Sequence, residues 1–309
     1  MTFALLRVAA GPRLGHGHLR RAEVLARALG RPCVVSIRGR GAPDLTLPTI
    51  AGGAAGAILD AVRPRVLVLD DPRERASRPW CVAARRRSVP VVSMHDLGLG
   101  PLPSDLAVDG SIVCRGRLPA RRVLRGPAYA TVAARPARRG DQVRRVLVSL
   151  GGGPRAALTR RIASTLTRRW PSLDVIATGG SGPADGFAWV AAPAGLSPWM
   201  AQVDVAVVGG GVTLYEAVGS GVPAIGVAVV AAQRPTIRGF AARGLALDGG
   251  LAAGGRDVVP SVCRAMTRLL ADAPWRRRVA IEGPRLIDGR GADRVARAIR
   301  DLAEGRGRA

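Results

Sequence analysis

The sequence contains no lysine and no asparagine, and aromatic residues make up only 3% of its 309 residues. Both missing residues use codons that begin with AA, so their absence indicates a GC-rich coding sequence in which arginine supplies the cations. The formal net charge of +25 therefore results partly from base composition, and it gives only weak support for nucleic-acid binding. The scarcity of aromatic rings argues against stacking of single-stranded nucleic acid. We expect no nucleic-acid partner, whereas an anionic small molecule or peripheral contact with an acidic membrane face fits the charge.

The cysteines and the apolar runs limit the class of protein further. Cys33, Cys81, Cys114 and Cys263 show no paired short spacing, which argues against a disulfide framework or a zinc knuckle and fits a reducing cytoplasm. The first residues have no basic leader and no cleavage site, so we interpret them as a strand and not as a signal peptide. The longest uncharged run, around Pro223, is too short to span a bilayer. We expect a soluble cytoplasmic protein without an integral membrane segment.

Short apolar runs alternate with helical stretches along most of the chain, which is typical of βαβ units and a parallel sheet. In the first half we predict strands at 3–9, 33–37, 65–70, 89–94 and 105–110, and the clearest helix at 19–29. The alternation breaks over 111–145, which holds ten arginines and one acidic residue. We interpret this stretch as a linker with an exposed basic edge.

A second series of strands is predicted at 144–153, 174–180, 203–211, 222–230 and 244–250, mostly ending in glycines. The sequence therefore predicts an α/β fold of two Rossmann-like, doubly wound domains, with ligands bound in a central cleft at the carboxyl ends of the strands. We place the domains at 1–135 and 136–285. Residues 286–309 contain an amphipathic helix that we expect to pack back across the domains.

The stretch Arg7–Arg21 carries the first candidate site. A strand leads into a glycine-containing loop and then into a helix that begins near His18, so that free backbone N–H groups face any anion bound there. The helix N-terminus and the neighbouring Arg20 and Arg21 disfavour an imidazolium, which would leave His18 neutral and suited to act as a base. The alternative is that His16 and His18 are exposed loop residues or helix caps. We expect no metal, because His-x-His side chains diverge and His95 has only Asp96 as a nearby co-ligand.

A second candidate site lies in "VDVAVVGGGVTLYEAVGSGVPAIG". The predicted strand 205–208 meets Gly209–Gly211, and Thr213 opens a helix that carries Glu216. Such a loop can hold a diphosphate on its N–H groups and the Thr213 hydroxyl, while Glu216 is placed to accept hydrogen bonds from a ribose. The alternative is that the glycines merely end a strand and that Glu216 is solvated. "SLGGGPR" is a weaker candidate of the same kind, and no Walker pattern is present.

Taken together, these motifs resemble the UDP-sugar hydrolases of pseudaminic acid biosynthesis, a nonulosonic acid pathway, within the GT-B glycosyltransferase superfamily. The resemblance is carried by Arg7 and the Gly-x-Gly-His loop, by "RGPAYA" at 125–130, by "VSLGGG" at 148–153, by the glycine loop with the stretch after it, and by "IDGRGADRV" at 287–295. It implies a GT-B-like fold and hydrolysis, without metal or cofactor, at the anomeric carbon of a UDP-linked amino sugar. UDP and free sugar would be released.

The same resemblance implies roles for individual residues. His18 would be the general base that activates water, and His16 would be incidental because its position varies in the family. Substrate binding would fall to Gly15, Gly17, Arg21, Tyr129, Gly151, Gly152, Gly210, Gly211, Thr213, Glu216 and Gln233.

The sequence also departs from the family pattern at positions expected to face the sugar. Ala9 stands where the family commonly has aspartate, Asp70 is kept in a segment that lacks the family's tyrosine, and Gly153–Pro154 replaces a polar pair. The alternative function is therefore a GT-B glycosyltransferase in which His18 deprotonates an acceptor hydroxyl, with the basic stretch 111–145 as a mark of a membrane-bound acceptor. A non-catalytic, basic nucleic-acid-binding protein is a third hypothesis, which the scarcity of aromatics disfavours.

Overall fold

The structure is a computed structural model that describes residues 2–11, 15–39, 45–95, 102–114, 116–136, 140–151, 155–193 and 195–306. The chain divides into two compact units, unit 1 (Met1–Thr131 with Arg290–Ala309) and unit 2 (Val132–Gly289). Both boundaries lie four residues from those expected, because the connecting residues pack on unit 2. The backbone N–H of Arg135 donates to Ser220 Oγ at 3.3 Å, and the carbonyl of Ala134 approaches Gly289.

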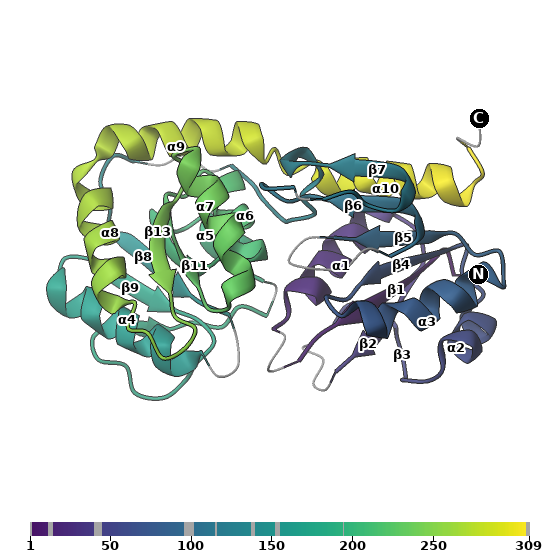
Figure 1. Cartoon of the computed structure of the whole chain (residues 1–309). Coiled ribbons are helices and arrows are strands. Elements are labelled where there is room, and N and C mark those ends of the chain that lie inside the picture. Colours follow the sequence, from purple (N-terminus) through teal and green to yellow (C-terminus); the bar gives the residue numbers. More distant parts are fainter. Residues whose placement is uncertain are drawn as a thin grey trace. The chain divides into compact units, whose positions relative to one another are not determined.

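Unit 1 is built on a parallel sheet in the strand order β3-β2-β1-β4-β5-β6-β7 (Figure 1). Its elements in chain order are β1 (Ala4–Ala9), α1 (Gly17–Leu29), β2 (Cys33–Arg38), β3 (Thr49–Ile50), α2 (Ala55–Val62), β4 (Val66–Asp70), α3 (Glu74–Arg85), β5 (Val91–Met94), β6 (Ser104–Asp109), β7 (Ala120–Arg125), the 3-10 helix η1 (Pro127–Tyr129) and α10 (Gly291–Ala303). All five strands predicted for the first half are present.

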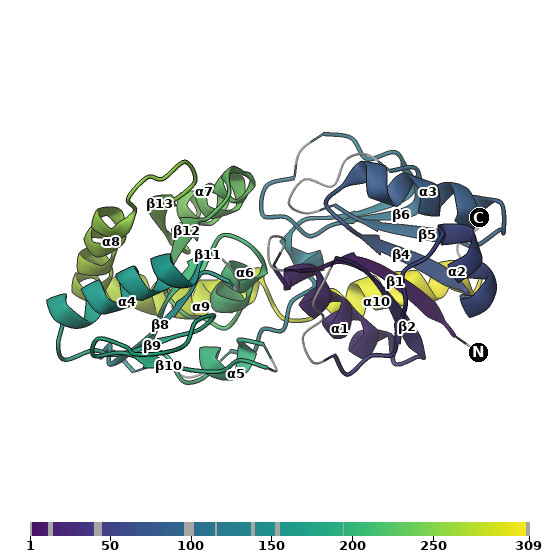
Figure 2. The same cartoon turned by 90° about the horizontal axis from the view of Figure 1, so that it is seen from below.

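Two helical layers cover the sheet of unit 1. Figure 2 shows α1 and α10 on one face and α2 and α3 on the other, in agreement with the two apolar clusters of this unit. The alternation of the strands explains this, because Leu6 and Val8 of β1 pack toward α1 while Leu5 packs toward α3. The sheet therefore has the two covered faces that a buried parallel sheet requires.

The structure bears out the exposed basic edge predicted in 111–145, and the two units divide within this stretch, but the edge is a strand that the sequence did not predict. Residues Ala120–Arg125 form β7, which pairs in parallel with β6 at the edge of the sheet. Leu124 is buried, while the arginines beside it are exposed. One apolar side chain and an outward row of charge are typical of an edge strand that resists further pairing, and this pattern is easily mistaken for a loop.

Unit 2 repeats the architecture with the strand order β10-β9-β8-β11-β12-β13, again in parallel. Its elements are β8 (Arg145–Ser149), α4 (Ala156–Arg169), β9 (Asp174–Ala177), β10 (Ala188–Trp189), α5 (Ser197–Met200), β11 (Val205–Gly209), α6 (Val212–Gly219), β12 (Ala224–Ala228), the 3-10 helix η2 (Ala231–Gln233), α7 (Arg234–Ala242), β13 (Leu247–Leu251), α8 (Val259–Ala271) and α9 (Ala273–Leu286). Helices α4 and α8 share one apolar cluster with the sheet, and α6 lies on the opposite side (Figure 1).

The C-terminal helix α10 belongs to unit 1. Val295 and Ile299 are fully buried against α1, and Arg300 Nη1 donates to the carbonyls of Ala28 and Leu29 at 3.0 and 3.2 Å. A cation at these terminal carbonyls also complements the dipole of α1. The chain thus returns to its first unit through apolar packing and one capping arginine.

Two further features of the structure are the lengths of its apolar helices and the state of its cysteines. Within the described part of the chain, no helix has the length and apolarity that crossing a bilayer requires. All four cysteines are free thiols, and burial raises the pKa of Cys33 to about 11, which makes it unreactive at neutral pH.

The docking of α10 gives a stability prediction. A Cβ built at Gly291 would lie 2.8 and 2.9 Å from the backbone carbon and nitrogen of Ala130, closer than packed atoms approach. We therefore expect Gly291→Ala to lower the free energy of unfolding by about 1–3 kcal/mol, as overpacking does. Gly52→Ala is the matched control, because a Cβ there meets nothing within 4 Å. Chemical denaturation of both variants tests this, and equal effects would contradict it.

Candidate functional site

The loop between β1 and α1 is closed by a pair of glycines. Gly11 and Gly15 form an isolated antiparallel bridge, with Gly15 N–H donating to the Gly11 carbonyl at 2.8 Å and the reverse bond at 3.3 Å. Both have positive φ, 144° and 77°, where a side chain would be strained. Gly17 is the first residue of α1. Gly11 and Gly15 therefore shape the turn before α1, and Gly17 begins the helix.

His18, in the first turn of α1, contacts a carboxylate at the end of a neighbouring strand. Its Nδ1 lies 2.8 Å from Oδ1 of Asp70, the last residue of β4. The His18 side chain is 12% exposed and that of Asp70 6%. Because β1 and β4 are adjacent and parallel, the start of α1 and the end of β4 meet at the carboxyl edge of the sheet. The sheet topology thus brings together two residues 52 positions apart in the chain.

Arg21, one helical turn after His18, completes a buried cluster. Its Nε donates to Asp70 Oδ2 at 2.6 Å and its Nη2 donates to Asp70 Oδ1, so the guanidinium and the carboxylate form a two-point ion pair. Only 5% of the Arg21 side chain is exposed. Paired planar groups of this kind make the strongest charge-assisted hydrogen bonds. The structure shows that Nε and Nη2 of Arg21 bond Asp70, while the binding of substrate by Arg21 stays a prediction.

The cluster fixes which nitrogen of His18 carries the proton. An ionised carboxylate only accepts hydrogen bonds, so the 2.8 Å contact requires a proton on Nδ1 of the imidazole. Nη2 of Arg21 lies 3.0 Å from the same nitrogen because both groups donate to one oxygen of Asp70. In the neutral form of an imidazole with this tautomer, Nε2 is the lone-pair acceptor, which is the form that a general base needs.

The ionisation of Asp70 depends on this pairing. Burial alone opposes the charged form, but the guanidinium of Arg21, together with His18, outweighs burial and holds the pKa of Asp70 well below its usual range. The carboxylate is therefore ionised throughout the neutral range and serves as a fixed negative charge beside His18.

His16 and Arg20 have other surroundings than His18. His16 precedes α1 without a side-chain capping bond, and burial, with Arg20 nearby, lowers its pKa. Arg20 Nη1 donates to Glu23 Oε2 at 2.7 Å. From the sequence, the positive charges of Arg20 and Arg21 were expected to disfavour a protonated His18. In the structure both guanidiniums are paired with carboxylates. His16 as a bystander stays a prediction.

The described candidate residues of unit 2 lie at or close to the carboxyl edge of its sheet. Gly151 follows β8, Gly210 and Gly211 follow β11, and Gln233 comes shortly after β12, where β8, β11 and β12 are adjacent strands. The helix α6 begins at Val212, one residue before the predicted Thr213, with Gly211 as its capping residue. Gly152 lies outside the described residues.

Close packing explains the glycine at position 210. A Cβ there would lie 2.7 Å from Ile237 and 3.0 Å from Cβ of Gln233. The Gln233 side chain holds the next loop, because its Oε1 accepts from Val229 N–H at 2.8 Å. Glu216 is 8% exposed within α6, which excludes the fully solvated alternative for this residue. The loop is therefore tightly built and backbone-rich at the start of α6.

The predicted residue Tyr129 and the third histidine, His95, lie elsewhere. Tyr129 sits in η1 and packs, half-buried, against the apolar cluster that joins α1 and α10. His95 is buried after β5, where its Nε2 lies 2.6 Å from Ser93 Oγ, and that hydroxyl contacts Ser104 Oγ at 2.8 Å. His95 thus belongs to a buried polar chain, and its predicted neighbour Asp96 lies outside the described residues.

The sequence indicated only that Asp70 is kept in a segment expected to face the sugar, and no contact with His18 or Arg21 was predicted for it or for Asp71 beside it. Asp71 accepts from Arg38 Nη2 at 2.7 Å, next to Arg7, whose guanidinium bonds Ser36 Oγ at 2.8 Å and stacks on Trp80 at 4.8 Å. The available signal was the acidic pair that ends the apolar run 66–69. Carboxylates at the end of a buried parallel strand lie at the sheet edge where ligands bind.

The Asp70 ion pair predicts a pH effect on stability. The pKa of Asp70 is lower in the folded chain than in the unfolded chain, where an aspartate has a pKa of about 3.9. On acidification the unfolded chain therefore takes up this proton before the folded chain does. The stabilisation is complete above the unfolded pKa and is lost as the pH falls below it. We expect Asp70→Asn to flatten this acid-side loss and, because Arg21 is left without its counter-charge, to cost about 3–5 kcal/mol at pH 7.

The measurement is the free energy of unfolding as a function of pH, from denaturant titrations between neutral and acidic pH. The exposed carboxylate of Asp293 supplies the control variant, Asp293→Asn. An unchanged acid-side slope in Asp70→Asn would contradict the assignment.

Comparisons with known proteins agree on the fold. No family model matches the chain. A 107-residue segment is 38% identical to the spore coat polysaccharide biosynthesis protein SpsG of Bacillus subtilis (strain 168), covering 34% of this chain and 30% of that protein. The match therefore spans less than a third of the relative's length.

Three solved structures illustrate the likeness of the whole chain. MurG of Acinetobacter baumannii has a TM-score of 0.67 at 14% identity over 97% of this chain and 99% of its own. The spinosyn forosaminyltransferase SpnP reaches 0.70 at 15% over 98% and 100%, and the spinosyn rhamnosyltransferase SpnG, complexed with thymidine diphosphate, 0.66 at 16% over 96% and 100%. Identities this low show the fold alone. The prediction of two Rossmann-like domains is confirmed, and the chain has the GT-B fold.

Proposed function

We propose that the protein is a nucleotide-sugar hydrolase that cleaves the anomeric C–O bond of a UDP-linked amino sugar. The observation that carries this proposal is the 2.8 Å contact of His18 Nδ1 with the Asp70 carboxylate at the carboxyl edge of a parallel sheet. The SpsG match supports a place in polysaccharide biosynthesis, and nonulosonic acid biosynthesis is the pathway that the motifs favour.

In the proposed reaction His18 Nε2 takes a proton from water as the water oxygen forms a bond to the anomeric carbon. The bond from that carbon to the phosphate oxygen breaks, and its electron pair leaves with UDP. Asp70 orients the imidazole and stabilises the positive charge that develops on it, as the carboxylate does in a catalytic triad. Arg21 acts through Asp70, by keeping that carboxylate ionised and in place.

The glycine loop of unit 2 is the proposed nucleotide site. Gly211 and Thr213 would hold the diphosphate on N–H groups at the start of α6, and Gly210, whose own N–H donates to the Val227 carbonyl at 3.3 Å, would let the diphosphate approach the backbone. Glu216 would accept hydrogen bonds from the ribose. Two glycosyltransferases of the same fold, SpnG and SsfS6, were crystallised with thymidine diphosphate, so a nucleoside diphosphate suits this architecture. The four free thiols support a reducing cytoplasm as the compartment.

The second candidate function is transfer of the sugar to an acceptor hydroxyl. It is favoured by the structural neighbours that are named as glycosyltransferases, among them SpnP and SpnG. In that reaction His18 would deprotonate the acceptor in place of water. UDP release from a UDP-sugar in water alone supports hydrolysis, whereas release that depends strictly on an added acceptor assigns transfer.

The two histidines of the motif give a direct test of the base. We expect His18→Ala to lower the rate of UDP release by about 10²–10⁴-fold, the usual worth of a general base, with UDP affinity unchanged. His16→Ala should keep the wild-type rate, because His16 has no hydrogen bond to Asp70 or Arg21 among the described contacts. Steady-state kinetics and calorimetric titration with UDP supply the readouts. Full activity in His18→Ala, or an equal loss in His16→Ala, would overturn the assignment.

The proposed ribose contact has its own test. If Glu216 binds the ribose diol, the protein should bind UDP about tenfold or more tightly than 2′-deoxy-UDP, since a hydrogen bond to a charged group is lost. We expect Glu216→Gln to reduce this discrimination while leaving the affinity for 2′-deoxy-UDP nearly unchanged. Glu282→Gln, at an exposed ion pair on α9, is the matched control. Undiminished discrimination in Glu216→Gln would contradict the role.

A further inference from the structure

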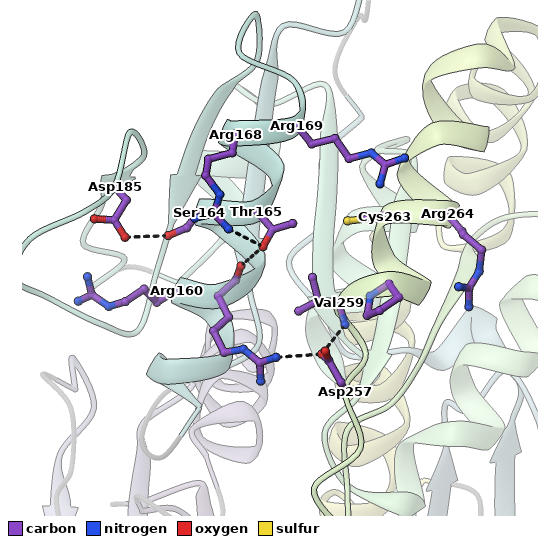
Figure 3. A pocket seen from close by; sticks show the side chains of 12 residues that line it. Arg160, Ser164, Thr165, Arg168, Arg169, Asp185, Asp257, Val259, Cys263 and Arg264 are labelled. Atoms are coloured by element: carbon purple, nitrogen blue, oxygen red, sulfur yellow. Dashed lines mark hydrogen bonds and ion pairs between the residues drawn. The ribbon is translucent and has the colours of Figure 1, made fainter.

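A basic groove runs between α4 and α8 of unit 2 (Figure 3). It encloses about 710 Å³, and its walls include Arg160, Arg161, Arg168 and Arg169 from α4 and Arg264 from α8. Figure 3 shows the Arg169 guanidinium reaching over the gap between the helices, near Cys263. The groove shares no residue with the glycine loop at the start of α6.

The two carboxylates in the groove already have partners. Asp257 pairs with Arg161 at 3.1 Å and accepts from Val259 N–H at 3.0 Å. Asp185 accepts from Ser164 Oγ at 3.4 Å. Arg160 binds the loop beside it by donating to the carbonyls of Pro183 and Ser181. The acidic groups therefore neutralise one of the five guanidiniums by direct contact.

Of the four arginines without a carboxylate partner, three also have few hydrogen bonds to the protein. Arg264 donates to Ser261 Oγ at 2.9 Å, Arg168 makes a long 3.4 Å contact with Thr165 Oγ1, and Arg169 stacks on Trp170 at 5.2 Å. In the described part of the chain, none of the three has a carboxylate within ion-pair distance. Each guanidinium carries five N–H donors, so most of these donors are available to a ligand.

The lining of the groove is rich in arginine. Arginines make up five of the 12 residues that line the groove, against 47 of 309 in the whole chain. Hydroxyl groups of Ser164 and Thr165 lie among them, and no aromatic side chain lines the groove. The lining therefore offers charge and hydrogen bonds without a surface on which a base stacks.

We propose that this groove binds a small polyanion that carries two or more phosphoryl groups and no required base. Guanidiniums recognise phosphate oxygens through paired N–H donors. The volume lies within the range of small-molecule sites, and a concave site on one side of a helix pair suits a compact anion better than a flat membrane. This proposal goes beyond the proposed function and does not depend on it.

The test measures binding of inorganic pyrophosphate to the full chain by isothermal titration calorimetry at two salt concentrations, with saturating UDP present to occupy the proposed nucleotide site. The groove variant is Arg168→Gln/Arg169→Gln/Arg264→Gln, which removes three of the four charges that lack a carboxylate partner and keeps much of each side chain's apolar stem. The control is Arg277→Gln/Arg278→Gln/Arg285→Gln, which removes the same charge from the exposed face of α9 in the same unit. Thermal unfolding by circular dichroism verifies that both variants are folded.

We expect the groove variant to bind pyrophosphate about tenfold or more weakly than the wild type, and the control to bind within about twofold. Equal loss in both variants would overturn the proposal, because it would assign binding to net charge. Unchanged binding in the groove variant would overturn it too, by placing pyrophosphate elsewhere. Phosphatidylglycerol vesicles and a single-stranded oligonucleotide are measured in parallel. Binding of either that is tighter than that of pyrophosphate and lost only in the groove variant would contradict the small-ligand assignment.

Discussion

The charge on Asp70 is the constraint on which the candidate site depends. An isolated carboxylate at the end of a covered strand would take up a proton or draw in water. Arg21 prevents this by a two-point ion pair, and that pair ties the first turns of α1 to the carboxyl end of β4. Once Asp70 is ionised and fixed, the orientation and the tautomer of His18 follow. One buried ion pair therefore sets both the local packing and the chemistry that His18 can perform.

Much of the fold could be predicted from the spacing of the apolar residues and from the glycines and acidic residues that end the apolar runs. The apolar runs 66–69 and 205–208 are too short for helices and end in acidic residues or glycine, and both are strands. The strand β7 was missed since its pattern is set by the edge of the sheet, where only Leu124 must be buried. The His18–Asp70 contact was missed for another reason, because it depends on β4 lying beside β1. The local spacing of apolar residues does not indicate which distant strands pair.

The glycines of the two units show how one residue type serves different needs. Gly15 is required by its backbone, because its φ is positive and it closes a bridge with Gly11. Gly210 is required by its neighbours, because Ile237 and Gln233 occupy the space of a side chain. A sequence motif reports both simply as glycine. The distinction matters for substitution, since a side chain at Gly15 would strain the backbone, whereas a side chain at Gly210 would collide with Ile237 and Gln233.

The abundance of arginine also has two meanings in this chain. Most arginines are exposed, and in a sequence without lysine they are the surface cations that base composition supplies. Arg21 is different, because it is almost fully buried and satisfies both oxygens of one carboxylate. A lysine ammonium is a point charge that loses its proton more readily when it is buried, so it would neither match the two oxygens nor secure the ionisation of Asp70. Base composition explains how many arginines the protein has, whereas geometry identifies those whose charge the site requires.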